Sequence, residues 1–261
     1  MERARAWAAL GFAAMTVGVF FVLAPIPQNP AYHNFADQRA WLGVPHFLDV
    51  FSNLGFLLVG VGGLAFMSRK ASAQSAHRFT ATSERRPYYF FFLGVFLTAF
   101  GSAYYHLAPD NARLVWDRLP MAVGFMSLLT AVISERVDAR LGSRLLAPLI
   151  ALGIGSVLYW RWTALRGHDD LRVYGLIQFG SIAAVALLAS FWTPRYTRGN
   201  DLIGVAGLYG LAKLCEWLDR PIFALGNIVS GHTLKHLAAA AACYGVLRML
   251  KLRTPIPGSR P

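Results

Sequence analysis

Residues 54–66 read LGFLLVGVGGLAF, an apolar run without a charged side chain. In the hydrocarbon of a membrane every backbone N–H and C=O must be satisfied within the structure, and a helix satisfies them internally. The run is continuous, whereas a strand of a membrane barrel alternates between apolar and polar residues. It therefore predicts a transmembrane helix, which extends over residues 48–67 and has the roughly 20 residues that a span needs.

The rest of the chain has the same character. Of its 261 residues, 56% are apolar and 15% are charged. We predict eight helical spans, at residues 7–24, 48–67, 88–107, 114–133, 145–162, 171–192, 202–218 and 229–250. Eight spans use about 160 positions, which leaves no room for a separate soluble domain. The predicted fold class is all-α, a polytopic transmembrane helix bundle.

The net charge of +12 raises the question of nucleic-acid binding. The basic residues lie between apolar segments and not on one face with interleaved aromatics, so we predict no nucleic-acid partner. With the amino terminus in the cytoplasm, sixteen Lys and Arg side chains fall on the cytoplasmic side and seven on the opposite side. This bias predicts a multi-pass membrane protein with both termini cytoplasmic.

The first span has a second interpretation. The basic start MERARA, the apolar run and the small-residue pattern Val22-Leu23-Ala24 are also typical of a secretory signal cleaved after Ala24. We favour a retained anchor because the apolar run is long for a signal. Cleavage would leave the topology of the remaining spans unchanged.

Polar side chains within spans are costly, so those present are candidates for function. Ser102 and His106 lie four residues apart in GSAYYH, Asp117 lies in VWDRLPM, and His232 and His236 lie four apart in SGHTLKH. Two histidines at this spacing share a helix face and are able to bind one metal ion, although each also fits a packing role. The predicted topology brings all five to one depth near the non-cytoplasmic side. We therefore predict a shared site.

Three neutral histidine ligands are typical of a catalytic zinc site, in which the fourth tetrahedral position is left for water. Zinc lowers the pKa of that water to about 7 and polarises a carbonyl group. In this hypothesis His106, His232 and His236 bind Zn²⁺, Asp117 moves the proton, and Ser102 donates a hydrogen bond to the oxyanion. A nucleophilic role for Ser102 is disfavoured because no histidine remains free to activate it.

These motifs together resemble a known family. GSAYYH at 101–106, WDRLPM at 116–121 and HTLKH at 232–236 are similar to segments of the alkaline ceramidase family. FSNL at 51–54 matches a further family segment, and residues 32–39 resemble the bacterial branch, the alkaline phytoceramidase-like proteins. The resemblance covers most of the chain from Tyr32 to the last span.

The resemblance implies an integral membrane zinc amidohydrolase that cleaves the N-acyl bond of ceramide or a related N-acyl lipid to a sphingoid base and a fatty acid. It implies His106, His232 and His236 as metal ligands, with Ser102 and Asp117 completing the catalytic set. Because the family core has seven spans, we expect an extra span and tail at 1–30, a seven-helix core at 31–250 and a cytoplasmic tail at 251–261.

The chain departs from the family at two positions near the predicted mouth. Arg118 stands where family members commonly have Glu, and Lys235 stands where an aromatic residue is frequent. The two cations either favour an anionic lipid or extend to membrane phosphates. Animal members carry a calcium site in an acidic segment for which this chain offers only Asp37 and Asp49, so we predict no calcium.

Other polar residues have simpler interpretations. We expect Lys213 and Glu216, three residues apart in the seventh span, to pair with each other. Asp219 resembles a family acidic position and is a candidate to support a histidine ligand. The remaining histidines lie in predicted loops, the outer ones as candidates for the entrance and the last as a solvated residue: His33, His46, His168 and His77.

Two alternatives to hydrolysis follow from the same residues. The wider superfamily includes seven-helix receptors with a similar zinc site, so the chain is alternatively a lipid receptor or lipid-binding protein without turnover. Asp117 favours the enzyme, because passive binding has no need of a proton acceptor beside the metal. A haem protein with two axial histidines would leave one of His106, His232 and His236 without a role.

Overall fold

The computed structural model describes residues 11, 14, 17–18, 22–68 and 78–258. Within these residues the protein is all-helical, and the only β-type pairings are two isolated bridges. Most of the predicted first span, 7–24, lies outside the described residues, as does His77. The predicted all-α fold class is confirmed for the part of the chain that is described.

Within the described part of the chain, five helical segments are long and apolar enough to cross a membrane. The first, Phe47–Ser68, consists of α2 (Phe47–Phe51) and α3 (Leu54–Ser68). The next three are α5 (Arg85–Leu107), α6 (Asn111–Arg136) and α7 (Ala139–Leu165). The fifth, Arg172–Phe191, joins α8 (Arg172–Gly175), the π-helical turn η3 (Leu176–Gly180) and α9 (Ser181–Phe191).

Two further predicted spans form helices, but each fails either the length or the apolarity that a membrane span requires. The segment 202–218 corresponds to α10 (Asp201–Trp217), which at 17 residues is slightly short. The segment 229–250 corresponds to α12 (Gly231–Leu252), which is long enough with 22 residues but carries ionisable side chains in its first turns. The short helices η1 (Pro30–His33), η2 (Thr82–Glu84) and α11 (Asp219–Ala224) lie in the connections.

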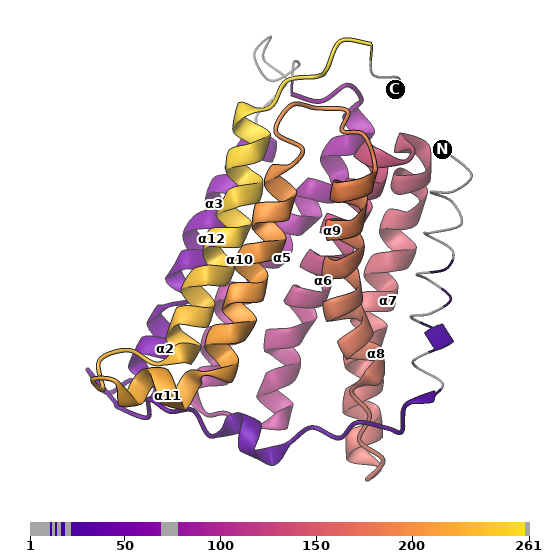
Figure 1. The fold of residues 1–261 in the computed structure, drawn as a ribbon. Coiled ribbons are helices and arrows are strands. Elements are labelled where there is room, and N and C mark those ends of the chain that lie inside the picture. The colour runs from indigo at the N-terminus through magenta and orange to yellow at the C-terminus, as the bar shows by residue number, and fades with distance from the viewer. Residues whose placement is uncertain (1–10, 12–13, 15–16, 19–21, 69–77, 259–261) are drawn as a thin grey trace.

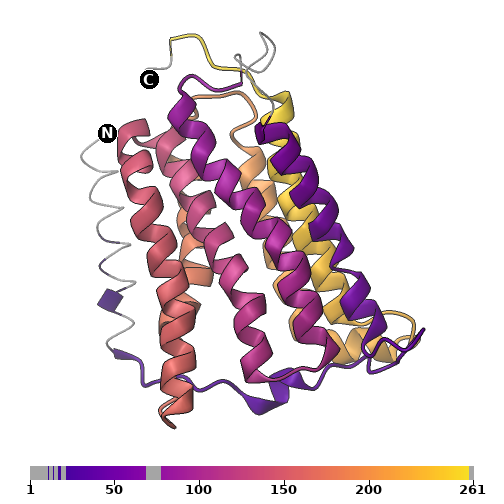
Figure 2. The same ribbon diagram turned by 180° about the vertical axis from the view of Figure 1, so that it is seen from behind.

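The long helices run roughly side by side (Figure 1). Contacts join α3 to α5, α5 to α6, α6 to α9, α9 to α10, α10 to α12, and α12 back to α3. These helices thus close a ring, and α7 packs on its outside against α6. Figure 2 shows the reverse side, where α3 lies along α5 and α12. The segment from residue 22 to α2 crosses the lower end of the bundle in Figure 1, near α11.

Capping side chains fix where the helices near this lower end begin. Asp110 precedes α6 and accepts a hydrogen bond from the Arg113 amide at 2.7 Å, and Ser230 precedes α12 and accepts one from the Thr233 amide at 3.0 Å. Such caps satisfy amides that have no partner in the first helical turn. Pro109 follows the end of α5 and disfavours helical geometry in the residue before it.

The crossing of α5 and α6 brings together two residues of the candidate site. A Cβ atom at Gly101 would lie 2.1 Å from the Trp116 carbonyl oxygen, so only glycine permits this approach. The helical donor for that carbonyl would be residue 120, but Pro120 has no N–H. The crossing therefore occurs where α6 leaves a carbonyl free, and it places Ser102 of α5 next to Asp117 of α6.

Candidate metal centre

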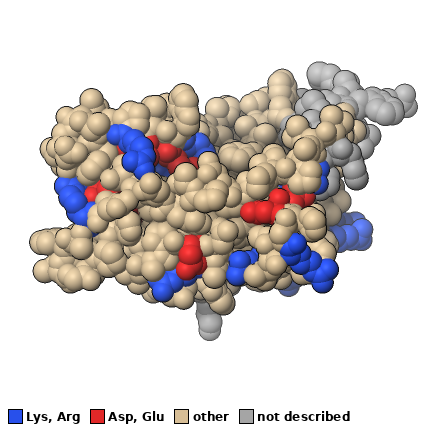
Figure 3. All heavy atoms as spheres, turned by 90° about the horizontal axis from the view of Figure 1, so that it is seen from below, with Lys and Arg blue, Asp and Glu red and all other residues tan. Residues whose placement is uncertain are grey.

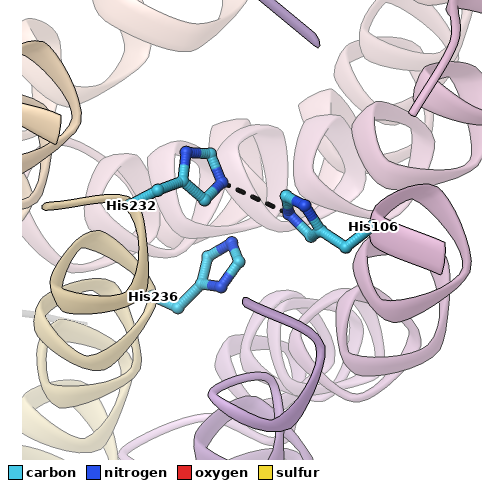
Figure 4. A group of neighbouring side chains, drawn as sticks. All are labelled: His106, His232 and His236. Carbon is cyan, nitrogen blue, oxygen red and sulfur yellow. Dashed lines mark hydrogen bonds between the residues drawn. The ribbon is translucent and has the colours of Figure 1, made fainter. Parts of the chain in front are cut away.

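Three buried histidines from two helices converge at the lower end of the bundle. His106 lies in the last turn of α5, and His232 and His236 lie in the first two turns of α12; none is more than 2% exposed. Their ring centroids are 4.8 to 5.0 Å apart. Figure 4 shows the three rings pointing toward one another. The predicted convergence of these residues is present in the structure.

The donor set suits a transition metal such as zinc. One ligand nitrogen from each ring can be chosen so that all three lie within 4.8 Å of one another, and the Nε2 atoms of His106 and His232 are 3.2 Å apart. Nitrogens bound tetrahedrally to zinc at 2.0–2.1 Å are separated by roughly 3.3–3.4 Å. The observed spacing fits one metal ion after small ring rotations. The identity of the metal does not follow from this geometry alone, because imidazole also suits copper, iron and nickel.

His236 is oriented by the turn between α2 and α3. Its Nδ1 atom lies 2.7 Å from Ser52 Oγ, and Ser52 also donates to the Asp49 carbonyl at 3.1 Å. This contact occupies Nδ1 and leaves Nε2 for a metal. Metal-binding histidines commonly have such a partner on the second nitrogen. His106 differs, because its Nδ1 atom is buried and has no hydrogen-bond partner among the described residues.

Two carboxylates hold the start of α12, from which two of the histidines project. Asp219 Oδ1 accepts a hydrogen bond from the His232 backbone N–H at 2.8 Å. Asp49, fully buried on α2, accepts hydrogen bonds from the hydroxyls of Thr233 at 2.6 Å and Ser230 at 3.2 Å. Asp219 thus supports a histidine residue, as predicted, but through its backbone and not its ring.

Phe35 covers the histidines on the side of the crossing segment. Its ring centroid lies 4.7 Å from that of His106 and 4.3 Å from that of His232, and the side chain is 3% exposed. The Ala36 amide donates to Asp219 Oδ2 at 2.9 Å, which fastens the segment to α11. An aromatic cover of this kind excludes water from one side of the site.

An ion pair closes the crossing segment near the α11–α12 connection. Arg39 binds Asp37 with Nη2–Oδ2 at 2.7 Å and also donates to the carbonyls of Asn227 at 2.5 Å and Ile228 at 2.8 Å. Burial opposes ionisation of Asp37, but the hydrogen bonds from Arg39 outweigh it and hold the pKa of Asp37 below its ordinary value. Seen from this end in Figure 3, acidic and basic side chains occur next to one another on a mostly uncharged surface. The Asp37 carboxylate is therefore already engaged by Arg39.

Asp117 and Ser102 lie on the wall of a cavity of about 130 Å³ that also reaches His236. Both are buried, Ser102 on α5 and Asp117 on α6. Much of the remaining wall is apolar and comes from several helices, including Phe56, Phe91, Val95, Phe125, Leu128 and Val205. The predicted catalytic pair therefore faces a largely apolar cavity inside the bundle.

A chain of charged groups runs along the cavity from α10 to the histidines. Glu216 pairs with Lys213, as predicted, and also accepts from Lys235 at 3.2 Å. Lys235 Nζ in turn lies 3.1 Å from His232 Nε2. Tyr32 donates to Glu216 at 3.2 Å, and burial raises the pKa of this phenol above its ordinary value, so its hydroxyl stays protonated. Lys235 is thus part of the site.

The two unusual cations point inward in this structure. The Lys235 side chain is 15% exposed and Arg118 is 6% exposed, and both line the cavity. A side chain that extends to membrane phosphates keeps its charged end in the aqueous interface. The interpretation of Arg118 and Lys235 as phosphate-seeking side chains is therefore not supported by their positions.

The other histidines have separate positions. His33 contacts the Tyr105 hydroxyl through Nδ1 at 2.8 Å and Asn111 through Nε2 at 2.9 Å, so both ring nitrogens are engaged. His46 lies 3.2 Å from the Asp37 carbonyl, and His168 is exposed. None of them joins the cluster.

Sequence reasoning did not assign roles to Ser52, Phe35 and Glu216 as supports of the site. Ser52 lies in the FSNL segment and Phe35 in the segment of residues 32–39, both of which were singled out only by resemblance. The only available signal for Ser52 was a polar pair, Ser52-Asn53, at the start of an apolar run. Nothing in the sequence indicated that Phe35 would cover two histidines.

Comparison with known proteins gives no family assignment. No family model matches the chain, and no curated protein matches it significantly.

Proposed function

We propose that this protein is a zinc-dependent intramembrane amidohydrolase that cleaves the N-acyl bond of ceramide or a related N-acyl lipid. The observation that carries the proposal is the buried cluster of His106, His232 and His236 together with Asp117 and Ser102 on the wall of an apolar cavity that reaches His236. A metal site alone fits many roles. A metal site with a neighbouring carboxylate and hydroxyl, inside an apolar cavity, fits hydrolysis of a lipid.

The three histidines would hold the metal, and bound zinc supplies an activated water and polarises the scissile carbonyl. Asp117 takes a proton from the attacking water and delivers it to the leaving amine. The Ser102 hydroxyl donates a hydrogen bond to the carbonyl oxygen as negative charge develops there. Phe35 restricts access of other water to the reacting groups.

The shape of the cavity supports a lipid as the substrate. Ser102 and Phe91 both lie on α5 and both line the cavity, and eleven residues of helix span about 16 Å. An acyl chain that enters beside Ser102 can therefore extend along α5 among apolar side chains. The sphingoid base and the fatty acid would be the products.

The proposal includes the architecture implied by the resemblance to alkaline ceramidases. Residues 31–250 form a seven-helix core, in which α10 and α12 cross the membrane with the five apolar segments. Polar side chains of α10 and α12 that lower their hydropathy face the cavity, including Lys213, Lys235 and His236, which supports this assignment. Both termini face the cytoplasm, and the site lies near the non-cytoplasmic side.

The test is turnover by the purified full chain. We expect steady release of fatty acid from a fluorescent ceramide, loss of release on adding a chelator, and recovery on adding zinc. Mass spectrometry of the products identifies the bond that is cleaved. Tight ceramide binding without product would instead indicate a zinc-containing lipid receptor, and turnover that is insensitive to chelators would contradict the metal mechanism.

A further inference from the structure

Arg118 is a buried cation held mainly by aromatic rings. Its guanidinium carbon lies 4.3 Å from the ring centroid of Trp160, 4.8 Å from that of Tyr174 and 5.8 Å from that of Tyr32. Its hydrogen bond within the described structure runs from Nη2 to the neutral amide oxygen of Gln28 at 2.6 Å. The rings fix the plane of the guanidinium group and leave its edge with few partners.

Arg118 makes no direct ion pair with a carboxylate among the described residues, although its charge acts on the neighbouring Asp117 carboxyl. Its Nη1 atom is buried and has no hydrogen-bond partner, and the described residues contain no ion pair to it. Two other arginines with little exposure have such pairs, Arg172 with Asp170 at 2.8 Å and Arg195 with Glu84 at 2.6 Å. The buried Arg136 instead donates to the backbone carbonyls of Trp192 and Gly199, so both of its terminal nitrogens have acceptors. Burial of an uncompensated cation is costly. The free donors of Arg118 are thus available for an anion that the chain does not supply.

Arg118 lies where two cavities meet. The first is the 130 Å³ cavity that holds Asp117 and His236. The second has a volume of about 690 Å³ and lies between residues 23–29 and the stretch 171–183. The two cavities share five lining residues: Tyr32, Arg118, Tyr174, Gln178 and Lys213. A ligand that occupies both cavities would pass beside the guanidinium group.

We propose that Arg118 binds an oxyanion, a carboxylate or phosphate, on the head group of the lipid whose acyl chain occupies the first cavity. A guanidinium group presents a planar pair of N–H donors that matches two oxygens of such a group. Lys213 lines the same junction, but its charge is paired with Glu216, so Arg118 is the group assigned to the anion. The inference rests on the proposed function, because it names the head group that the site prefers: an anionic N-acyl lipid binds more tightly than a neutral one such as ceramide.

Three lipids that share the same dodecanoyl chain but differ in head group separate the effect of head-group charge from that of the acyl chain. N-dodecanoylglycine carries a carboxylate, N-dodecanoylethanolamine carries a neutral hydroxyl, and its phosphate ester carries a phosphate. Their affinities are measured on the full chain after chelator treatment, so that no lipid is consumed. We expect at least one of the two anionic lipids to bind ten or more times more tightly than the neutral lipid, and Arg118→Gln to abolish that difference.

Matched variants make the test specific. Arg118→Lys keeps the charge but not the planar donor pair and should retain only part of the preference. Arg166→Gln is the control, because Arg166 also stacks on a tryptophan, 4.5 Å from the Trp162 centroid, but lines neither cavity; the preference should be unchanged. Equal loss of affinity for all three lipids in Arg118→Gln would overturn the proposal.

The affinities of the wild-type protein alone test the assignment of Arg118, even if a variant does not accumulate. Equal affinity for the anionic and neutral lipids would overturn the assignment. Inorganic phosphate that competes as tightly as the lipid phosphate ester would overturn it as well, because the site would then recognise a free ion. Turnover is measured separately with zinc present: an anionic preference in binding without hydrolysis of any lipid refutes the proposed amidohydrolase activity and leaves the oxyanion site in place.

Discussion

The two ends of the bundle both bury charged side chains, but they satisfy them differently. At the end where α5 begins and α12 finishes, Glu84 pairs with Arg195 at 2.6 Å and Glu135 pairs with Arg253. Each of these carboxylates also accepts a hydrogen bond from a tyrosine hydroxyl. The chain itself supplies the partners of these charges, and the buried Arg136 at the same end donates to the backbone carbonyls of Trp192 and Gly199.

At the opposite end, several buried polar groups have no charged partner among the described residues. His106, His232 and His236 lie together without a carboxylate on any ring nitrogen among the described residues, and the hydrogen-bond partner of Arg118 there is a neutral amide. Paired buried charges support the folded state, whereas unpaired ones in a membrane protein indicate a site for an ion or ligand. We call the end with Glu84 and Glu135 the structural end, and the end with the three histidines and Arg118 the functional end.

Removal of a histidine should give the largest effect. In His232→Ala we expect loss of the bound metal and of all measurable turnover, because two imidazoles hold a metal far more weakly than three. Metal content is measured on purified protein by mass spectrometry. His168→Ala is the control, since His168 is exposed and should leave both quantities unchanged. A wild-type metal content in His232→Ala would show that the cluster is a packing feature.

Substitution of Asp117 should separate rate from metal binding. Asp117→Asn keeps the size of the side chain but cannot accept the proton, so we expect turnover to fall by on the order of 10² to 10⁴ while most of the metal remains. Asp110→Asn is a matched control, because Asn caps a helix about as well as Asp. Equal loss of metal in His232→Ala and Asp117→Asn would contradict the separate roles.

Hydropathy predicted the positions of the helices closely. The span predicted at 88–107 is α5, Arg85–Leu107, and the span predicted at 114–133 is α6, Asn111–Arg136. The irregular features were not predicted: the turn at Ser52-Asn53 and the π-helical turn at Leu176–Gly180. Hydropathy averages over about one span, whereas such local breaks depend on contacts with other helices.

The histidine cluster could be predicted from the sequence, because the spacing of residues on a helix face and the alternating direction of successive spans are both regular. His232 and His236 share a helix face, and the alternation of spans placed His106 at the same end. The supports were not accessible in this way. Ser52 and His236 are separated by 184 positions in the sequence, and only the packing of α3 against α12 brings them together. The inward orientation of Arg118 likewise depends on its aromatic neighbours.

Breaking a pair at the structural end should affect stability and not the metal. Glu135→Gln removes the buried partner of Arg253, whose side chain is fully buried, and breaking such a pair costs about 3–5 kcal/mol. Arg248→Gln is the matched control at the same end: Arg248 is 51% exposed and 3.9 Å from Asp201, so the effect should be below about 1 kcal/mol. Unfolding in detergent measures both. A loss of metal in folded Glu135→Gln would show that the two ends are coupled.

We expect the smallest effect from removing a hydrogen-bond partner of one metal-binding histidine. Ser52→Ala removes the hydroxyl that lies 2.7 Å from His236 Nδ1 but leaves all three histidines in place. Loss of such a partner typically weakens metal binding by about 10- to 100-fold, which competition with a calibrated chelator detects. Ser127→Ala is the control, because the Ser127 hydroxyl is buried and has no hydrogen-bond partner among the residues that the structure describes. If both variants bind metal like the wild type, His236 is oriented by the packing of α12 alone and Ser52 serves only to fix the α2–α3 turn.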